Sequence, residues 1–184
     1  MTVLLTNRVS IMTISLYEAT VDNYLQVLKS MEVLLDKGEM FCRENGIDLA
    51  SIVSTRLIEN MNPFQFQVIS VVHHSLGALK GLESGEFAPP LGYGNPDYAS
   101  LKTLVSQAYS QVQLFDAAKV NKWSGQTVTF KIEGTEIPFT VENFVLSFSL
   151  PNFYFHATTT YDVLRMKGVP LGKRDFMGSM RVGV

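Results

Sequence analysis

The sequence predicts an all-α protein, an antiparallel four-helix bundle with a small β-hairpin before the last long helix. Four long segments carry apolar residues at helical spacing, between residues that typically cap helices. A fifth segment, residues 126–140, alternates apolar and polar residues as β-strands do. With 184 residues, the chain is long enough for one domain with a sizeable core.

The first predicted long helix covers residues 21–45. Thr20 is its candidate N-cap and Gly46 its C-terminal cap, and apolar residues recur between them at helical spacing. Asp48 is a candidate cap for a short helix over residues 49–53.

The second long helix is predicted to begin at Asn62-Pro63, as N-cap and first helical residue, and to end at Gly85. The following segment, residues 87–95, reads FAPPLGYGN and is predicted to be a Pro/Gly loop. Because this loop is short, we expect the second and third helices to be antiparallel neighbours.

The pair Asn95-Pro96 repeats the same start signal for the third long helix. Beyond it, TVTFKI and EIPFT alternate around Glu133-Gly134, which predicts a β-hairpin within residues 126–140. The inward face of the third helix is predicted to consist of Leu101, Leu104, Val105, Ala108, Val112 and Phe115.

The last long helix is predicted to cover residues 140–168. Thr140 can serve as its N-cap, and Gly168 as a left-handed C-terminal cap. Pro151 removes a backbone donor, so we expect a kink near Ser147. Apolar residues occur on almost every side of this helix, which predicts burial by several neighbours.

Charge and composition exclude several classes of protein. The net charge of −2 and the pI near 5.9 provide no basic field for nucleic acid. No segment approaches the roughly 18 uninterrupted apolar residues that a membrane span requires. Cys42 is the sole cysteine, so we expect no internal disulfide, an inert packing thiol and a cytoplasmic location.

The organisation predicted from these patterns has three parts. Residues 1–13 are an N-terminal tail, with Met12 as an alternative start, and residues 14–178 form the bundle domain. Residues 179–184 are a C-terminal tail. No HExxH, CxxC pair or Glu-x-x-His motif of metal-dependent enzymes occurs.

Two histidines are the candidate functional residues. On the second helix, His74 shares a face with small residues, while His73 lies at the boundary of that face. Such a face indicates either the close approach of another helix or space for a ligand or metal beside the imidazole. The small residues are Ser70, Gly77, Ala78 and Gly81.

On the last helix, His156 lies one turn after Asn152, on a face that also contains Phe148. It is either a core histidine with satisfied ring nitrogens or, paired with His74 across the bundle, a ligand or an acid–base group.

Two segments resemble a branch of unknown function in the DinB/YfiT-like superfamily of proposed metalloenzymes. They are ISLYEATVDNYLQVLKSMEVLLDKGE near the start and LPNFYFHATTTYDVLRMKGVPLGKRDF near the end. The resemblance covers residues 14–178 and implies an antiparallel four-helix bundle, often dimeric. In the superfamily three histidines bind a divalent metal, and some members transfer thiols or isomerise small molecules.

The superfamily ligand positions correspond to His74, Asn152 and His156 in this chain. Because Asn152 departs from the histidine triad, we expect either no metal or a weakly bound divalent metal. An amide oxygen is a weak zinc ligand beside imidazole.

These observations favour a bundle that binds a small-molecule ligand between the second and fourth long helices. His74 and His156 are its candidate catalytic groups, if it is an enzyme of the transferase or isomerase type. Its predicted pocket residues are His73, Phe148, Asn152, Tyr154 and Tyr161. The alternative is a non-catalytic dimeric scaffold with a degenerate metal site, and in both cases a homodimer is expected.

Overall fold

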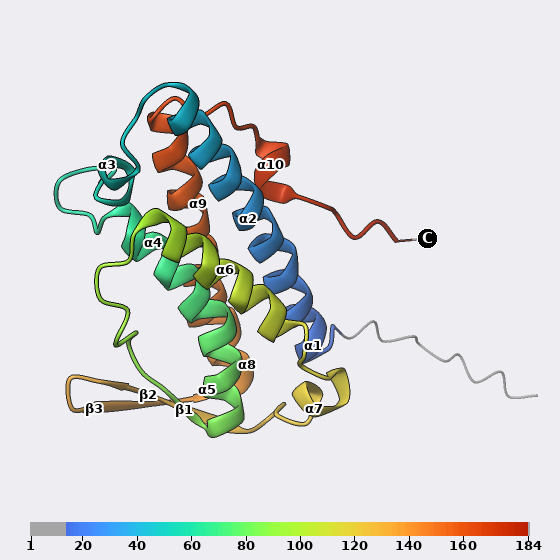
Figure 1. Ribbon diagram of the computed structural model, residues 1–184. Coiled ribbons are helices and arrows are strands. Elements are labelled where there is room, and N and C mark those ends of the chain that lie inside the picture. Colours follow the sequence, from blue (N-terminus) through green and yellow to red (C-terminus); the bar gives the residue numbers. More distant parts are fainter. Residues whose placement is uncertain (1–13, 184) are drawn as a thin grey trace, which may run out of the picture.

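The computed structural model describes residues 14–183, which are mostly helical (Figure 1). The predicted tail of residues 1–13 lies outside this range. The symbol η denotes a π-helical turn. The helical elements are α1 (Leu16–Ala19), α2 (Val21–Glu44), α3 (Leu49–Val53), α4 (Phe64–Val72), η1 (His73–Gly77), α5 (Ala78–Ser84), α6 (Tyr98–Val112), α7 (Ala117–Asn121), α8 (Val141–Asn143), η2 (Phe144–Ser149), α9 (Leu150–Met166) and α10 (Lys173–Met177).

Four long helical segments dominate the fold: α2, the α4–η1–α5 segment, α6 and the η2–α9 segment (Figure 1). α2 packs along α6 and α4 packs along α9, while α4 also contacts α6 and α2 contacts α9. The helical class predicted from the sequence is therefore confirmed. Within residues 14–183, no helix has the length and apolar character needed to cross a membrane. Large side chains buried between the segments include Tyr24, Phe64, Tyr98, Phe144 and Phe153.

The second long segment begins one residue later than the sequence indicates. Pro63 is the N-cap of α4 and Phe64 its first residue, whereas Asn62 lies outside the helix. The end of the segment is as predicted. Gly85 follows α5 with φ of 80°, the left-handed conformation that glycine adopts readily.

α6 also begins later than predicted, because Asp97 rather than Asn95 caps it. The carboxylate of Asp97 accepts a hydrogen bond of 2.8 Å from the backbone N–H of Ser100. Phe115 was predicted on the inner face of this helix but lies beyond its end, where its ring packs edge-on against Trp123.

The last long helix is not continuous. It is divided into α8, the π-helical turn η2 and α9, and the predicted kink position, Ser147, lies within η2. Pro151 has no N–H to donate to the carbonyl of Ser147, which explains an irregular turn just before it. The helix packs against several neighbours, as predicted, since α9 contacts α4, α2 and η1. Leu146 and Phe155 are nevertheless 62% and 55% exposed, so one side of the segment is left uncovered.

The two π-helical turns, neither of which the sequence predicted, meet in the interior. The Ser149 hydroxyl at the end of η2 donates a buried hydrogen bond of 3.1 Å to the carbonyl oxygen of His74 in η1. This contact joins the second and fourth long segments where both depart from α-helical geometry. Because π-helical turns occur often at functional sites, the junction directs attention to the side chains around His74.

A small sheet covers one end of these segments. Strands β2 (Thr127–Ile132) and β3 (Thr135–Thr140) form the predicted antiparallel hairpin. Glu133 and Gly134 at its turn have φ of 48° and 79°, as a type I′ turn requires. The sheet also contains β1 (Glu86–Phe87), which pairs in parallel with β2. The sequence did not predict this strand, since the Pro/Gly loop was expected to begin at residue 87.

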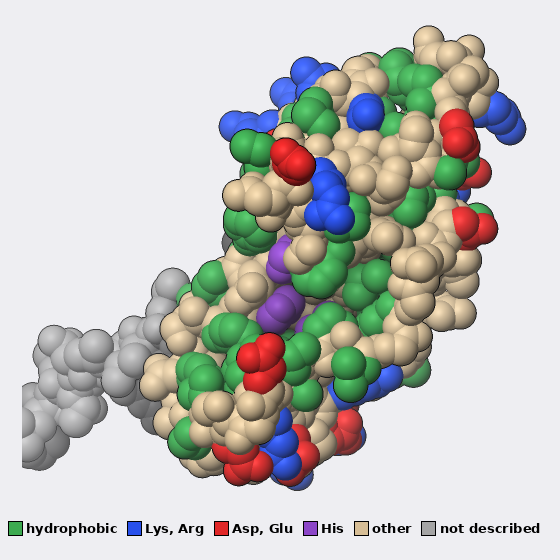
Figure 2. All heavy atoms as spheres, turned by 90° about the vertical axis from the view of Figure 1, so that its left-hand side faces the viewer, with side chains coloured by type: hydrophobic (Ala, Val, Ile, Leu, Met, Phe, Trp, Pro, Cys, Tyr) green, Lys and Arg blue, Asp and Glu red, His purple; other side chains and the backbone are tan. Residues whose placement is uncertain are grey.

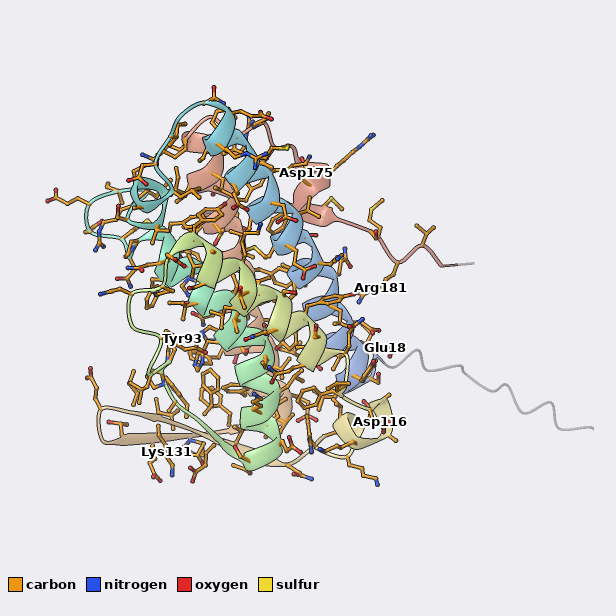
Figure 3. All side chains as sticks on the ribbon, viewed as in Figure 1. Glu18, Tyr93, Asp116, Lys131, Asp175 and Arg181 are labelled. Atoms are coloured by element: carbon orange, nitrogen blue, oxygen red, sulfur yellow. The ribbon has the colours of Figure 1, made fainter. Side chains whose placement is uncertain are left out.

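The C-terminal part of the described chain lies against α2. Asp175 of α10, labelled in Figure 3, forms an ion pair with Lys37, with 2.6 Å between Oδ1 and Nζ. The side-chain amide of Gln26 donates to the carbonyl oxygen of Met177 at 2.9 Å. These contacts hold α10 on the outer side of α2.

Candidate functional site

The structure brings the three histidines of the chain together, and we call His73, His74 and His156 the histidine cluster. The rings of His73 and His74 in η1 are 5.4 Å apart, centroid to centroid. The ring of His156 on α9 lies 6.0 Å from that of His74 and is nearly parallel to it, at 15°. Figure 2 shows histidine side chains next to one another at the surface, with hydrophobic side chains around them.

Phenylalanines from several elements surround the histidine cluster. The ring of Phe87 in β1 is 4.4 Å from that of His73, and Phe148 in η2 is 5.5 Å from His74. Phe66 in α4 is 5.8 Å from the ring of His156. The sheet therefore has a clear role, because β1 brings Phe87 against the histidines.

This apolar environment keeps the imidazoles uncharged. Burial lowers the pKa of His73 to about 4, an effect that the Ala88 backbone partly opposes. Burial and the neighbouring imidazoles lower the pKa of His74 to about 3, and burial lowers the pKa of His156 to about 4. At neutral pH the histidine cluster therefore consists of three neutral rings, each with one protonated and one unprotonated nitrogen.

The polar contacts of these rings differ. The Nδ1 atom of His156 lies 2.7 Å from Oε1 of Gln67 on α4. His74 is only 8% exposed, and its Nδ1 atom has no hydrogen-bond partner among residues 14–183. The buried Nε2 atom of His73 likewise has none within that range. An unpaired buried polar atom costs about 1–3 kcal/mol, so these two nitrogens reduce the stability of the fold unless another group pairs with them.

The small-residue face beside His74 has an explanation in packing. A Cβ atom at Gly81 would lie 3.0 Å from the ring of Phe87 and 3.1 Å from the carbonyl oxygen of Glu86. A Cβ atom at Gly77 would lie 3.0 Å from Nδ1 of His73. At Gly81 glycine is thus required by close approach, as one of the two interpretations held, but the approaching element is strand β1 rather than a helix; at Gly77 the close neighbour is His73 of the same turn.

Of the other predicted pocket residues, the structure places Phe148 at the cluster and the two tyrosines away from it. Tyr154 is two residues before His156 in α9, about 200° around the helix, and its ring packs against Phe153. The ring of Tyr161 packs at 6.1 Å against Phe176 of α10.

Asn152 lies one turn before His156 but uses its side chain within the helix. Its Nδ2 atom donates a hydrogen bond of 2.7 Å to the carbonyl oxygen of Phe148. Among residues 14–183 there is no group of three or more His, Cys, Asp or Glu side chains placed to hold a metal ion. The donor set of two imidazoles and an amide already engaged with the backbone does not fit the three-histidine metal site of the superfamily.

Sequence reasoning missed Gln67 and Phe87. Gln67 precedes His74 by seven residues, a spacing that places both on one face of a helix, so a signal for it existed. Phe87 had none, because its position depends on the pairing of β1 with a strand some forty residues later.

Hollows on the surface of residues 14–183 that lie away from the histidine cluster include the following two. One of about 450 Å³ is bounded by α3 and the starts of α4 and α6, with Leu49, Val53, Gln65 and Tyr98 among its lining residues. The other, of about 360 Å³, is lined by Ile14, Leu146 and Leu150, among others.

Comparison with solved structures agrees with this architecture. The chain is similar to the crystal structure of a DinB family member protein from Shewanella denitrificans, with a TM-score of 0.77 and 25% sequence identity. The match covers 92% of this chain and 95% of that one. The fold and this likeness define a DinB-like helical protein.

The family follows from the sequence comparison. Residues 16–177 match the model of the family described as Domain of unknown function (DUF1993), and the chain belongs to this family. The comparison with curated proteins found no match.

Proposed function

We propose that this protein binds a small, uncharged molecule at the histidine cluster, between the α4–η1–α5 and η2–α9 segments of an antiparallel four-helix bundle. The observation that carries the proposal is the buried Nδ1 atom of His74, which has no partner among residues 14–183 and lies in a ring parallel to that of His156. A ligand group that pairs with this nitrogen gains a hydrogen bond in a poorly solvated environment, where such bonds are stronger.

Any catalysis at this site would use proton transfer by neutral imidazoles. The pKa values of His74 and His156 are lowered, so at neutral pH each ring is neutral and has one nitrogen with a free lone pair, as a general base requires. On this basis we also propose that the protein can act as an enzyme of the transferase or isomerase type, without a step that depends on a metal.

The proposal is tested by a thermal-shift screen with thiols, metabolite mixtures and divalent metals. A ligand that binds only the folded state raises the melting temperature by mass action. We expect at least one uncharged compound to raise the melting temperature of the wild type and to lose that effect in His74→Gln. Gln65→Leu, on the same helix and lining the 450 Å³ hollow, is the matched control and should retain the effect.

If the shift is lost in Gln65→Leu but kept in His74→Gln, the ligand site is the hollow at α3 and the proposal is wrong. A screen in which every shift survives both substitutions contradicts it equally.

We also propose a homodimer, on a separate observation. Leu146 and Tyr154 lie eight residues apart in the η2–α9 segment and are 62% and 38% exposed, with the half-buried Leu150 between them. An apolar strip of this kind favours association with a second copy. Native mass spectrometry at micromolar concentration should show a dimer that Leu146→Asp converts to monomer, and a wild-type monomer would exclude it.

A further inference from the structure

We infer that Gln67 holds His156 in the tautomer with its proton on Nδ1, so that the histidine cluster presents an unprotonated Nε2 to its ligand and selects a neutral hydrogen-bond donor rather than an anion. The ligand class rests on the proposed function. The tautomer stands on the hydrogen bonds around Gln67 alone.

The first step is the orientation of the Gln67 side chain, which is 2% exposed. Its Nε2 atom lies 2.9 Å from the backbone carbonyl oxygen of Asn62. A carbonyl oxygen can only accept, so the NH₂ group must face Asn62 and the amide cannot be reversed without burying two acceptors against each other. The Oε1 atom of Gln67 therefore faces His156.

The second step is the proton of His156. Its Nδ1 atom is 2.7 Å from Oε1 of Gln67, and this oxygen can only accept a hydrogen bond. Nδ1 must therefore carry the hydrogen. A neutral imidazole has one N–H, so Nε2 retains its lone pair and acts as an acceptor or a base. Gln67 is thus a positioning residue, which acts on a ligand through His156.

The third step is the chemistry around the ring. The side chains in ring contact with His156 are those of His74, Phe66 and Phe155, all uncharged. No Lys or Arg among residues 14–183 is hydrogen-bonded to the histidine cluster. An anionic ligand at the rings would lose its hydration without finding a cation in hydrogen-bond contact with the imidazoles. A neutral molecule with an apolar body and one O–H or N–H group would place that group on Nε2 and its body against the phenylalanines.

The tautomer can be measured directly in the full chain. With ¹⁵N-labelled histidine, long-range ¹H–¹⁵N correlation at pH 7 distinguishes protonated from unprotonated ring nitrogens, and His156→Gln assigns the signals. We expect a protonated Nδ1 and an unprotonated Nε2 for His156 in the wild type. Gln67→Leu, which removes this acceptor, should shift the ring toward the Nε2-protonated form.

Gln65→Leu, two residues away on the same helix, is the matched control and should leave the pattern unchanged. A wild-type His156 protonated on Nε2, or a folded Gln67→Leu variant with the wild-type pattern, overturns the role of Gln67.

The ligand class is tested in the same spectra with three monosubstituted benzenes: phenol, anisole and benzoate. Phenol offers a donor, anisole has none, and benzoate is an anion. We expect phenol alone to shift the His156 Nε2 signal, with about fivefold weaker binding in Gln67→Leu, the effect of one lost hydrogen bond.

The two parts of the inference fail in different ways. If the tautomer is as inferred but phenol leaves the Nε2 signal unmoved, the ligand class and the proposed function are wrong while Gln67 keeps its role. If benzoate binds as well as phenol, the selection against anions is wrong.

Discussion

Lowering the pH from 7 to 5 should destabilise this protein through the histidine cluster. The pKa values of the three imidazoles are about 4, 3 and 4 in the folded state, against 6.5 for an ordinary histidine. The unfolded chain therefore takes up protons first as the pH falls. The stability associated with neutral, buried histidines is fully present above pH 6.5 and is lost as the pH falls toward the folded values.

The size of the effect follows from these values. Between pH 7 and pH 5, a histidine whose pKa falls from 6.5 to about 4 loses about 1.8 kcal/mol of unfolding free energy. Three such groups would lose about 5 kcal/mol in total. His73 and His156 are only partly buried, so water weakens the effect and we expect a loss of about 3 kcal/mol.

The chosen pH range isolates the histidines from the carboxylates. Hydrogen bonds lower the pKa values of Glu18 and Asp97, among others, below their ordinary 4.5 and 3.8, so the stability that they contribute is lost only in more acidic solution. Urea unfolding at half-unit steps between pH 7 and 5 measures the effect.

Each single substitution, His73→Gln, His74→Gln or His156→Gln, should reduce the pH dependence by about a third, whatever it does to the stability at pH 7. A wild-type unfolding free energy that is constant over this range would refute the burial of neutral imidazoles. If a variant that lacks all three histidines shows the same pH dependence of the unfolding free energy as the wild type, the histidines are not its cause.

Three further predictions concern single substitutions. We predict substoichiometric zinc or none in the purified wild type, and a higher zinc content in Asn152→His, which places two imidazoles one turn apart on α9. Metal analysis of the two proteins prepared side by side measures the difference. Gly81→Ala should lower the unfolding free energy by about 1–3 kcal/mol, because the new Cβ would press on Phe87 and on the carbonyl of Glu86; an unchanged urea midpoint would contradict the close approach of β1. Tyr24→Phe should leave the unfolding free energy unchanged or raise it by up to about 1 kcal/mol, because the buried Tyr24 hydroxyl has no hydrogen-bond partner within residues 14–183. A clear decrease in the unfolding free energy, measured by calorimetry, would show that this hydroxyl does make a stabilising hydrogen bond.

The sequence was most informative where local chemistry decides the structure. Gly46, Gly85 and Gly168 mark helix ends with φ of 65°, 80° and 90°, and only glycine adopts such angles freely. Gly134, with φ of 79°, marks the hairpin turn for the same reason. These signals are short-range, so they can be recognised without knowledge of the tertiary structure.

The parts that sequence reasoning missed depend on contacts between distant segments. The π-helical turn at His73–Gly77 inserts one residue into a helical repeat, which apolar periodicity does not resolve. Phe87 reaches the histidines only because β1 pairs with β2. The meeting of His74 and His156 was predicted from two helix faces. Tyr154 and Tyr161 are close to His156 in sequence, but their rings pack against Phe153 and Phe176 instead.

The most direct test of the histidine cluster as a ligand site is the effect of phenol on the ring nitrogens of His74 and His156 in the ¹⁵N-histidine spectrum of the wild-type protein at pH 7. We predict a saturable shift of the unprotonated Nε2 signal of His156, accompanied by a shift of the Nδ1 signal of His74, which lies in the adjacent parallel ring. Ring-nitrogen signals that remain unchanged up to the solubility limit of the protein–phenol mixture would contradict the account.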